Sequence, residues 1–258
     1  MTTVELAYRR QGSGPPLLCL HGLLGSGRNW VGIATALADR FDVILPDLRN
    51  HGTSPWSDEV TYPAMAADVT ALLDRLGLDR VHLLGHSMGG KVAMTLALTV
   101  PERIDRLIVA DIAPVQYGPG LETYIDAMLA VDLSQVTRRD QADAALTAAA
   151  PEPGIRSFLL QNLERREGQF TWRPNLAALR AAMPLIRGFP DLPGARPYQD
   201  PCCFIHGARS TYVQDEHLPR VRELFPGATL HTIKDAGHWL HTEQPQAFLD
   251  ALLLCLRR

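Results

Sequence analysis

Residues 81–90 contain a serine in a setting that suits nucleophilic catalysis. The motif Gly85-x-Ser87-x-Gly89 follows an apolar run and precedes a helix-like stretch at residues 91–98. A serine hydroxyl is a weak nucleophile until the fold exposes it and pairs it with a base. A sharp strand-to-helix turn exposes the hydroxyl, small flanking residues relieve its crowding, and the helix start supplies amide donors. The motif therefore predicts that Ser87 attacks a substrate carbonyl.

Acyl transfer by such a serine also needs a base, an acid that orients the base, and donors for the oxyanion. His238 is the candidate base, because it follows the last expected strand, where folds built around this serine motif carry their histidine. His241 is a weaker alternative, since a histidine one turn further on is more often structural or exposed.

Two backbone amides are expected to hold the oxyanion. The amide of Met88 comes directly after the nucleophile and is a donor by construction of the turn. The second donor should come from the loop after residues 17–20, which begins His21-Gly22. Glycine permits close backbone approach there, and Leu23 is the predicted donor.

Short apolar runs predict the strands that position these residues. Residues 4–10 alternate apolar and polar side chains, as an edge strand with one wet face does. The other runs are continuously apolar and separated by helical stretches, which is typical of a parallel sheet covered on both faces. They comprise residues 17–20, 43–45, 81–84, 107–110 and 203–205, and residues 228–233 are expected to form the last strand.

Helices are expected at residues 30–38, 63–76, 87–100 and 245–256. Thr61 would cap the second of them and Gly77 would end it. The fold class is therefore α/β, a doubly wound, mostly parallel sheet, in which ligands bind at the carboxyl ends of the strands. Those ends carry His21, Asp47, Ser87, Asp111 and His206.

Between residues 113 and 197, helical patterns follow one another without an apolar strand-like run between them. Helices are expected at residues 124–129, 141–150, 155–163 and 176–186, with a short extended piece at 170–172. We interpret residues 113–197 as a helical cap inserted into a core formed by residues 1–112 and 198–258. The cap would shield the catalytic end of the sheet and supply apolar lining to the pocket.

Composition narrows the class of partner. The chain has 258 residues and a net charge of -3, without a block of Lys and Arg that would suggest nucleic-acid binding. No run is long enough to span a bilayer and no signal peptide is apparent, so a cytoplasmic protein that acts on a small molecule is expected. No metal or cofactor is predicted, because zinc-binding spacings and the dinucleotide motif are lacking. The sequence does not predict the oligomeric state.

Cys19, Cys202, Cys203 and Cys255 have no spacing typical of a disulfide framework. We expect them to be reduced, buried thiols. In a strand, the adjacent Cys202 and Cys203 would point to opposite faces.

The chain resembles the α/β-hydrolase superfamily and, within it, the YbfF-like esterase branch. The resemblance covers nearly the whole chain. It rests on the segments at residues 47–52, 85–91, 111–115, 175–176, 188–190 and 237–239. It implies the α/β-hydrolase fold and a cofactor-free hydrolase of carboxylic esters or acyl thioesters.

The chain departs from the commonest superfamily layout at the acid. Most members carry an aspartate after the next-to-last strand, but Ser210 occupies that position here and cannot supply a negative charge. Asp111 ends the neighbouring strand and could reach the same ring, so we predict that it orients His238, with Ser210 as an auxiliary partner. Asp215 and Asp235 are the rival carboxylates.

These observations predict a serine esterase or thioesterase that cleaves esters of small apolar acyl groups through an acyl-enzyme. Two alternatives stay open: a ligand-binding or receptor module on the hydrolase fold, and a C–C hydrolase or lyase on the same scaffold. Turnover of a simple ester would distinguish the serine esterase from the binding module. Poor ester turnover with a reactive serine would indicate the C–C chemistry.

Overall fold

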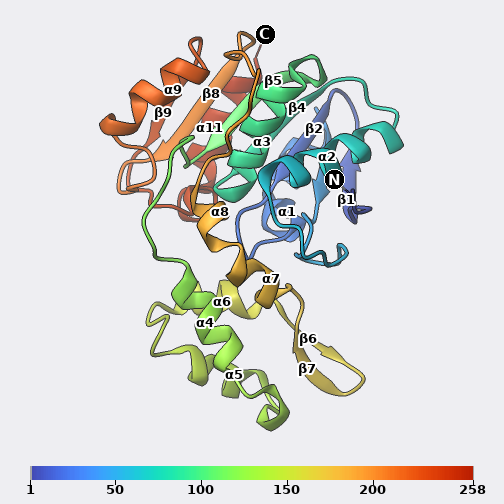
Figure 1. The fold of residues 1–258 in the computed structure, drawn as a ribbon, viewed down its shortest axis with the longest axis vertical. Coiled ribbons are helices and arrows are strands. Elements are labelled where there is room, and N and C mark those ends of the chain that lie inside the picture. The colour runs from blue at the N-terminus through green and yellow to red at the C-terminus, as the bar shows by residue number, and fades with distance from the viewer. Residues whose placement is uncertain (1, 258) are drawn as a thin grey trace.

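Seven strands form one sheet in the computed structural model, which describes residues 2–257 (Figure 1). The sheet order is β1-β3-β2-β4-β5-β8-β9. The strands are β1 (Tyr8–Gly12), β2 (Pro16–Leu20), β3 (Asp42–Pro46), β4 (Val81–His86), β5 (Ile104–Ala110), β8 (Cys202–Gly207) and β9 (Thr229–Ile233). Of these, β1 alone runs antiparallel to its neighbour. The mostly parallel, doubly wound sheet is thus confirmed.

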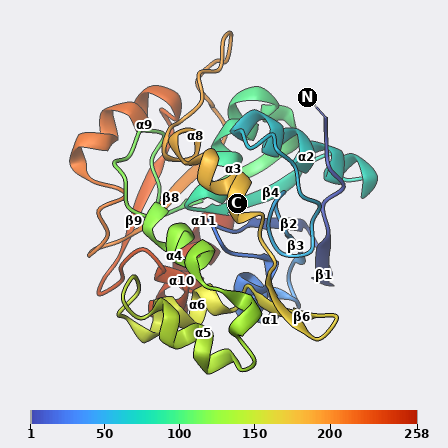
Figure 2. The same ribbon diagram turned by 60° about the horizontal axis from the view of Figure 1, so that its bottom comes forward.

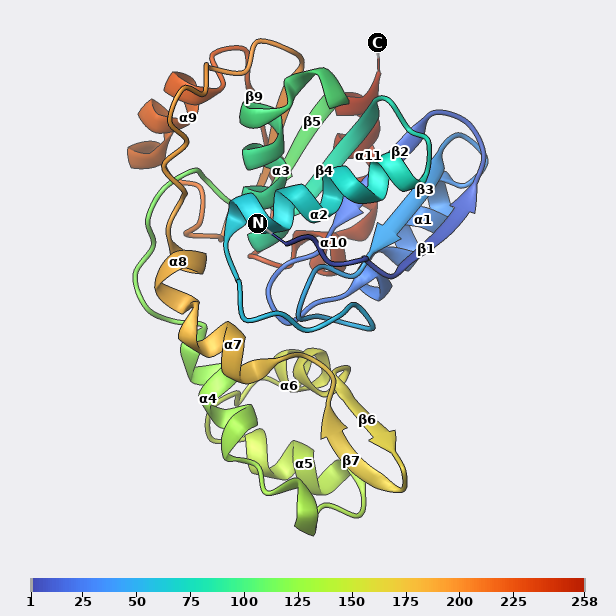
Figure 3. The same cartoon turned by 45° about the vertical axis from the view of Figure 1, so that its right-hand side comes forward.

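Helices cover both faces of the sheet, which is why its central strands are apolar throughout. Along β2, Leu17 and Cys19 pack in one core cluster and Leu18 and Leu20 in the other, as successive side chains of a strand must. The cluster of Leu18 and Leu20 contains residues of α2 (Tyr62–Arg75) and α3 (Met88–Thr99). The cluster of Leu17 and Cys19 contains residues of α1 (Val31–Leu37) and α11 (Pro245–Leu256). Figure 3 shows α2 and α3 in front of the sheet and α11 behind it.

The ends of α2 follow the predicted signals. The Thr61 hydroxyl accepts a hydrogen bond from the amide of Ala64 at 3.3 Å, which satisfies one free donor of the first turn. Gly77 follows the helix with a φ of 65°, a conformation that glycine adopts without a steric penalty. None of the helices within residues 2–257 combines the length and apolar character needed to cross a bilayer.

The first strand begins later than predicted. Residues 4–7 precede the strand: the Val4 amide donates to Asp68, the Ala7 amide donates to Ser54, and only the Ala7 carbonyl accepts from the backbone after β3, at Asp47. Pairing with β3 covers only Tyr8 to Gly12. The alternation of residues 4–10 therefore indicated an edge strand correctly but placed it about half a strand too early.

An insertion separates β5 from β8 and lies below the sheet in Figure 1 and in front in Figure 2. It contains α4 (Glu122–Ala130), α5 (Arg139–Leu146), α6 (Pro153–Leu160), α7 (Leu176–Ala181), α8 (Met183–Arg187) and the hairpin β6 (Leu163–Arg166) and β7 (Gln169–Trp172). The extended piece at residues 170–172 is confirmed as part of this hairpin. The single helix expected at residues 176–186 is two helices, because Pro184 has no N–H to continue the ladder.

The prediction of four reduced thiols is wrong for Cys203 and Cys255, which form a disulfide. Cys203 faces the side of the sheet that α11 covers, and its Cα lies 6.0 Å from that of Cys255, within the usual range for a disulfide. A sequence separation of 52 residues gives no hint of this contact. Cys19 and Cys202 are free and buried, and Cys202 faces the opposite core cluster, as predicted.

A buried ion pair fixes the loop after β3. Arg49 and Asp68 both have fully buried side chains, and the Arg49 guanidinium donates to both oxygens of Asp68, at 2.6 Å and 2.8 Å. Arg49 also donates to the carbonyls of Glu59 and Ala64. Since a buried pair is costly once either partner is lost, this contact ties α2 to the loop at residues 47–60.

Replacement Arg49→Met should lower the free energy of unfolding by about 3–5 kcal/mol, because it leaves the Asp68 carboxylate buried and unpaired. Urea denaturation measures this change. The matched control is Arg180→Met, which removes an exposed pair with Asp126 and should cost about 1 kcal/mol or less. Equal losses in the two variants would contradict the role assigned to Arg49.

Candidate active site

The turn between β4 and α3 holds Ser87 in a strained conformation. Its φ is 53° and its ψ is -119°, a region that residues other than glycine rarely adopt. A Cβ at Gly85 would lie 2.2 Å from the carbonyl oxygen of Gly89, and one at Gly89 would lie 2.5 Å from that of His21. Both glycines of the motif are therefore required sterically, and Gly89 also lets α3 approach the loop after β2.

Ser87, His238 and Asp111 form one hydrogen-bonded chain. The Ser87 Oγ lies 3.0 Å from Nε2 of His238, and Nδ1 of the same ring lies 2.7 Å from Oδ2 of Asp111. Asp111 is fully buried, whereas His238 is partly exposed. The structure thus brings together the three residues that the sequence singled out, and such a chain can move a proton from the hydroxyl to the imidazole.

Contacts from two further residues fix the Asp111 carboxylate. The amide of Gly207 donates to Oδ1 at 3.0 Å, and the hydroxyl of Ser210 donates to Oδ2 at 2.5 Å. Ser210 therefore contacts the acid rather than the imidazole. The rival carboxylates Asp215 and Asp235 are both exposed on the surface.

The two predicted oxyanion donors border the same space as the nucleophile. Met88 is the first residue of α3, so its amide has no acceptor within the helix. Leu23 lies in the turn after β2, closed by a hydrogen bond from the Gly25 amide to the Gly22 carbonyl. Leu23 and Met88 both line a cavity with Ser87. Their role as donors stays a prediction.

Two aromatic residues hold His238 in place, and sequence reasoning missed the role of both. The Tyr212 ring stacks on the imidazole, with centroids 4.0 Å apart and planes inclined by 23°. His86 Nε2 lies 2.8 Å from the backbone carbonyl of His238, and burial lowers the pKa of His86, so this ring is neutral and donates. The position of His86 beside the nucleophile was the one available signal.

Lys91, one turn after Ser87, was also missed. Its ammonium donates to the carbonyls of Val115, Arg187 and Gly188, at 2.9, 2.7 and 2.5 Å. Val115 lies where the chain enters the insertion, and Arg187 and Gly188 lie where it leaves. Burial lowers the pKa of Lys91 to about 7, while three carbonyl acceptors favour the charged form. A lysine within a helix that has no other charged residue was a signal for such a buried role.

His241 is a buried packing residue rather than an alternative base. It is 7% exposed, and its ring lies 4.6 Å from Trp30 and 6.1 Å from Phe248, measured between centroids. Burial lowers the pKa of His241 to about 3, so the ring is neutral at ordinary pH.

Two cavities meet at Ser87. The Trp239 cavity has a volume of about 30 Å³ and is bordered by His238, Trp239, Ile155 and Phe158. The Ile186 cavity has a volume of about 240 Å³ and is bordered by Met88, Ile112, Met183 and Ile186. Ser87, Leu23 and Leu121 border both cavities. The reactive hydroxyl therefore lies between two spaces, each closed partly by the core and partly by the insertion.

Comparison with known proteins shows the family to which the chain belongs. The family described as having the alpha/beta hydrolase fold matches residues 15–245. The chain belongs to the α/β-hydrolase fold family. This hydrolase is 37% identical to Esterase YbfF of Escherichia coli over 245 residues, which are 95% of the chain and 94% of that protein. The resemblance to the YbfF-like branch is thereby confirmed.

Other relatives of this hydrolase carry related names. It is 44% identical to the mouse protein named sn-1-specific diacylglycerol lipase ABHD11, over 92% of the chain and 80% of that protein. A solved structure described as a marine microorganism esterase has a TM-score of 0.95 and 39% sequence identity, and the match covers 98% of this chain and 100% of that one.

The stability of the hydrolase should fall as the pH falls from 7 to 5. The folded state holds the His241 pKa near 3, whereas an unfolded histidine has a pKa of about 6.5, so over this range only the unfolded chain gains the proton. His241→Phe should therefore lose about 2 kcal/mol less unfolding free energy between these two pH values than the wild type.

Denaturation at both pH values measures this difference. The control Phe248→Leu alters packing against the same ring without removing a titrating group, and it should lower stability by similar amounts at pH 7 and pH 5. An equal loss between the two pH values in wild type and His241→Phe would contradict the neutral, buried histidine.

Proposed function

We propose that the protein is a serine hydrolase that cleaves carboxylic esters or acyl thioesters of small apolar acyl groups through an acyl-enzyme. The observation that carries this proposal is the hydrogen-bonded chain from Ser87 through His238 to Asp111, which opens on two cavities. Relatives named as esterases and as a lipase support hydrolysis of carboxylic esters.

In the first half of the reaction, Ser87 Oγ attacks the substrate carbonyl carbon while Nε2 of His238 takes the hydroxyl proton. The amides of Leu23 and Met88 stabilise the oxyanion of the tetrahedral intermediate. The imidazolium then returns the proton to the leaving oxygen or sulfur, and the bond from the carbonyl carbon to that atom breaks. In the second half, water repeats these steps on the acyl-serine and releases the acid.

Asp111 stabilises the imidazolium that forms in both halves. Its carboxylate is buried and shared between His238, Ser210 and the Gly207 amide, so it holds the ring with Nε2 directed at Ser87. A misoriented triad loses about 10⁴-fold in kcat, which sets the scale for this contribution.

We propose that residues 113–197 act as the cap and that residues 1–112 and 198–258 form the hydrolase core. Leu121, Ile155 and Phe158 of the insertion border the cavity next to Ser87, which supports this role. We also propose a cytoplasmic location. Because disulfides persist mainly in oxidising compartments, Cys203 and Cys255 would there be present as two thiols.

Ser87→Ala should abolish ester hydrolysis and leave folding nearly intact, since it removes only the attacking oxygen. Turnover of p-nitrophenyl butyrate and the mass of protein treated with a serine-directed phosphonate measure this. One adduct is expected on the wild type and none on the variant. Hydrolysis that persists in Ser87→Ala would reject the nucleophile, and a phosphonate-reactive wild type without ester turnover would favour C–C chemistry.

Asp111→Asn should lower kcat by about 10²- to 10⁴-fold, because a neutral amide neither orients the imidazole nor stabilises its charged form. Ser210→Ala should cost much less, since Asp111 keeps its bonds to His238 and Gly207. Asp215→Asn is the matched control for charge, and it should retain normal kcat because Asp215 is exposed. Normal turnover in Asp111→Asn together with a large loss in Asp215→Asn would overturn the assignment.

A further inference from the structure

The two cavities at Ser87 differ in which groups of the reaction they contain. His238 borders the Trp239 cavity, whereas Met88 borders the Ile186 cavity. We propose, building on the serine-hydrolase function, that the Ile186 cavity binds the acyl chain and the Trp239 cavity binds the leaving group. The side chains of Ile112, Met183 and Ile186 then set the length of acyl chain that the protein accepts.

The path of the proton places the leaving group. The leaving oxygen must reach Nε2 of His238, because that atom returns the proton when the bond to the carbonyl carbon breaks. His238 and Trp239 both border the Trp239 cavity. The chain attached to the leaving oxygen therefore starts in that cavity, and a leaving group larger than its volume of about 30 Å³ extends past it.

The tetrahedral intermediate leaves one direction for the acyl chain. Its central carbon carries Oγ of Ser87, the oxyanion, the leaving oxygen and the first carbon of the acyl chain. The oxyanion faces the amides of Leu23 and Met88, and the leaving oxygen faces His238. The acyl chain is the remaining substituent, and we place it in the Ile186 cavity, which Ser87 and Met88 border and His238 does not.

The size of the Ile186 cavity also suits an acyl chain. Its volume of about 240 Å³ compares with about 30 Å³ for the Trp239 cavity, so it has more room for several methylene groups. Ile112, Met183 and Ile186 are all buried apolar residues. They provide the contacts that favour an apolar chain.

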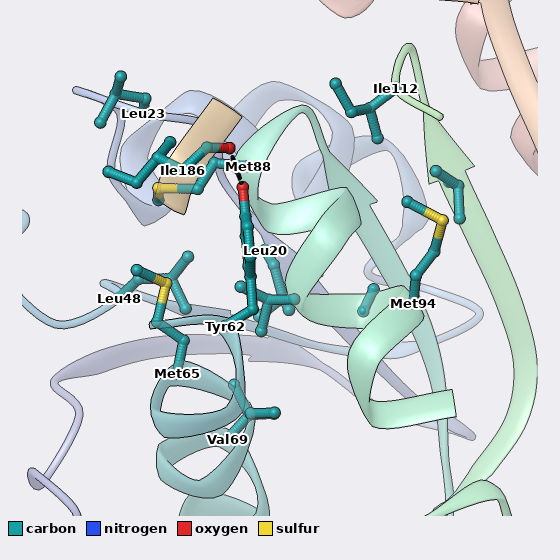
Figure 4. Packing of buried hydrophobic residues seen from close by; sticks show 14 of the residues in the cluster. Leu20, Leu23, Leu48, Tyr62, Met65, Val69, Met88, Met94, Ile112 and Ile186 are labelled. Atoms are coloured by element: carbon teal, nitrogen blue, oxygen red, sulfur yellow. Dashed lines mark hydrogen bonds between the residues drawn. The ribbon is translucent and has the colours of Figure 1, made fainter. Parts of the chain in front are cut away.

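Three polar side chains that border the Ile186 cavity, those of Tyr62, Lys91 and Arg187, are already engaged. The Tyr62 hydroxyl donates to the Ile186 carbonyl at 2.6 Å, and Figure 4 shows this bond with Leu23 and Met88 beside it. The Lys91 ammonium is shared by three carbonyls, and Arg187 pairs with Glu122. None of these cations is free to receive a carboxylate, so the acyl group should be uncharged.

The same contacts anchor the backbone of one wall of the cavity. Tyr62 and Lys91 are core residues, and they hold the backbone of Ile186, Arg187 and Gly188 where the insertion rejoins the core. A change in the Ile186 side chain therefore alters the depth of the cavity without removing any of these bonds, because Ile186 contributes only its carbonyl to them.

The test compares two substrate series in purified full-length protein. The first series varies the acyl chain of p-nitrophenyl esters from acetate to octanoate, and the second varies the alcohol of acetate esters from methyl to hexyl. Ile186→Phe should lower kcat/KM for hexanoate relative to acetate by roughly tenfold or more, and leave the alcohol series in its wild-type proportions. Ile155→Phe, which narrows the Trp239 cavity, should lower kcat/KM for hexyl acetate relative to methyl acetate and leave the acyl series in its wild-type proportions.

Two further variants keep the test decisive. Leu185→Phe is the matched control, since Leu185 lies in the same helix as Ile186, is 56% exposed and borders neither cavity. It should change neither series. Ile186→Ala should raise kcat/KM for octanoate relative to hexanoate, which gives a second reading if the larger side chain disturbs folding.

Exchanged responses of Ile186→Phe and Ile155→Phe would overturn the assignment of the cavities, and so would an Ile186→Phe acyl series identical to the wild type. Titration with the phosphonate separates this failure from failure of the proposed function. A wild type that neither hydrolyses esters nor reacts at Ser87 rejects both proposals, whereas a reactive enzyme with exchanged responses rejects the cavity assignment alone.

Discussion

The steric constraint at the turn from β4 to α3 governs the arrangement of the whole site. Ser87 has a φ of 53° there, and its flanking glycines leave no room for a Cβ. Because Gly89 brings α3 against the carbonyls at the end of β2, the same glycine that relieves the turn also brings the Leu23 loop beside the nucleophile. The strain is offset by the sheet and helix that continue on either side.

Parallel pairing of neighbouring strands places Asp111 and Ser210 close to Ser87. β4, β5 and β8 are neighbours, so Ser87, Asp111 and Ser210 follow their carboxyl ends at one edge of the sheet. Asp111 also has a positive φ, of 52°, and its carboxylate reaches the Gly207 amide of the adjacent strand. The insertion that follows Asp111 is then tied back to α3 by Lys91, so the helix that carries the nucleophile also fixes the cavity walls.

Sequence patterns predicted the elements whose signals are local. Continuous apolar runs indicated the buried strands, and Thr61 and Gly77 marked the ends of α2. The motif around Ser87 indicated the nucleophile. Because position 210 is a serine and not an aspartate, the sequence also pointed to Asp111 as the acid. Contacts between distant segments had no local signal: the bond between Cys203 and Cys255, the stacking of Tyr212 on His238 and the carbonyls around Lys91 all depend on how the layers pack.

Partitioning between two nucleophiles tests whether hydrolysis passes through an acyl-enzyme at Ser87. Esters of one acid with different alcohols are hydrolysed in the presence of methanol, and the ratio of methyl ester to free acid is measured. One ratio is expected for all of the alcohols, because each ester forms the same acyl-serine before water or methanol attacks. A ratio that changes with the leaving alcohol would contradict it.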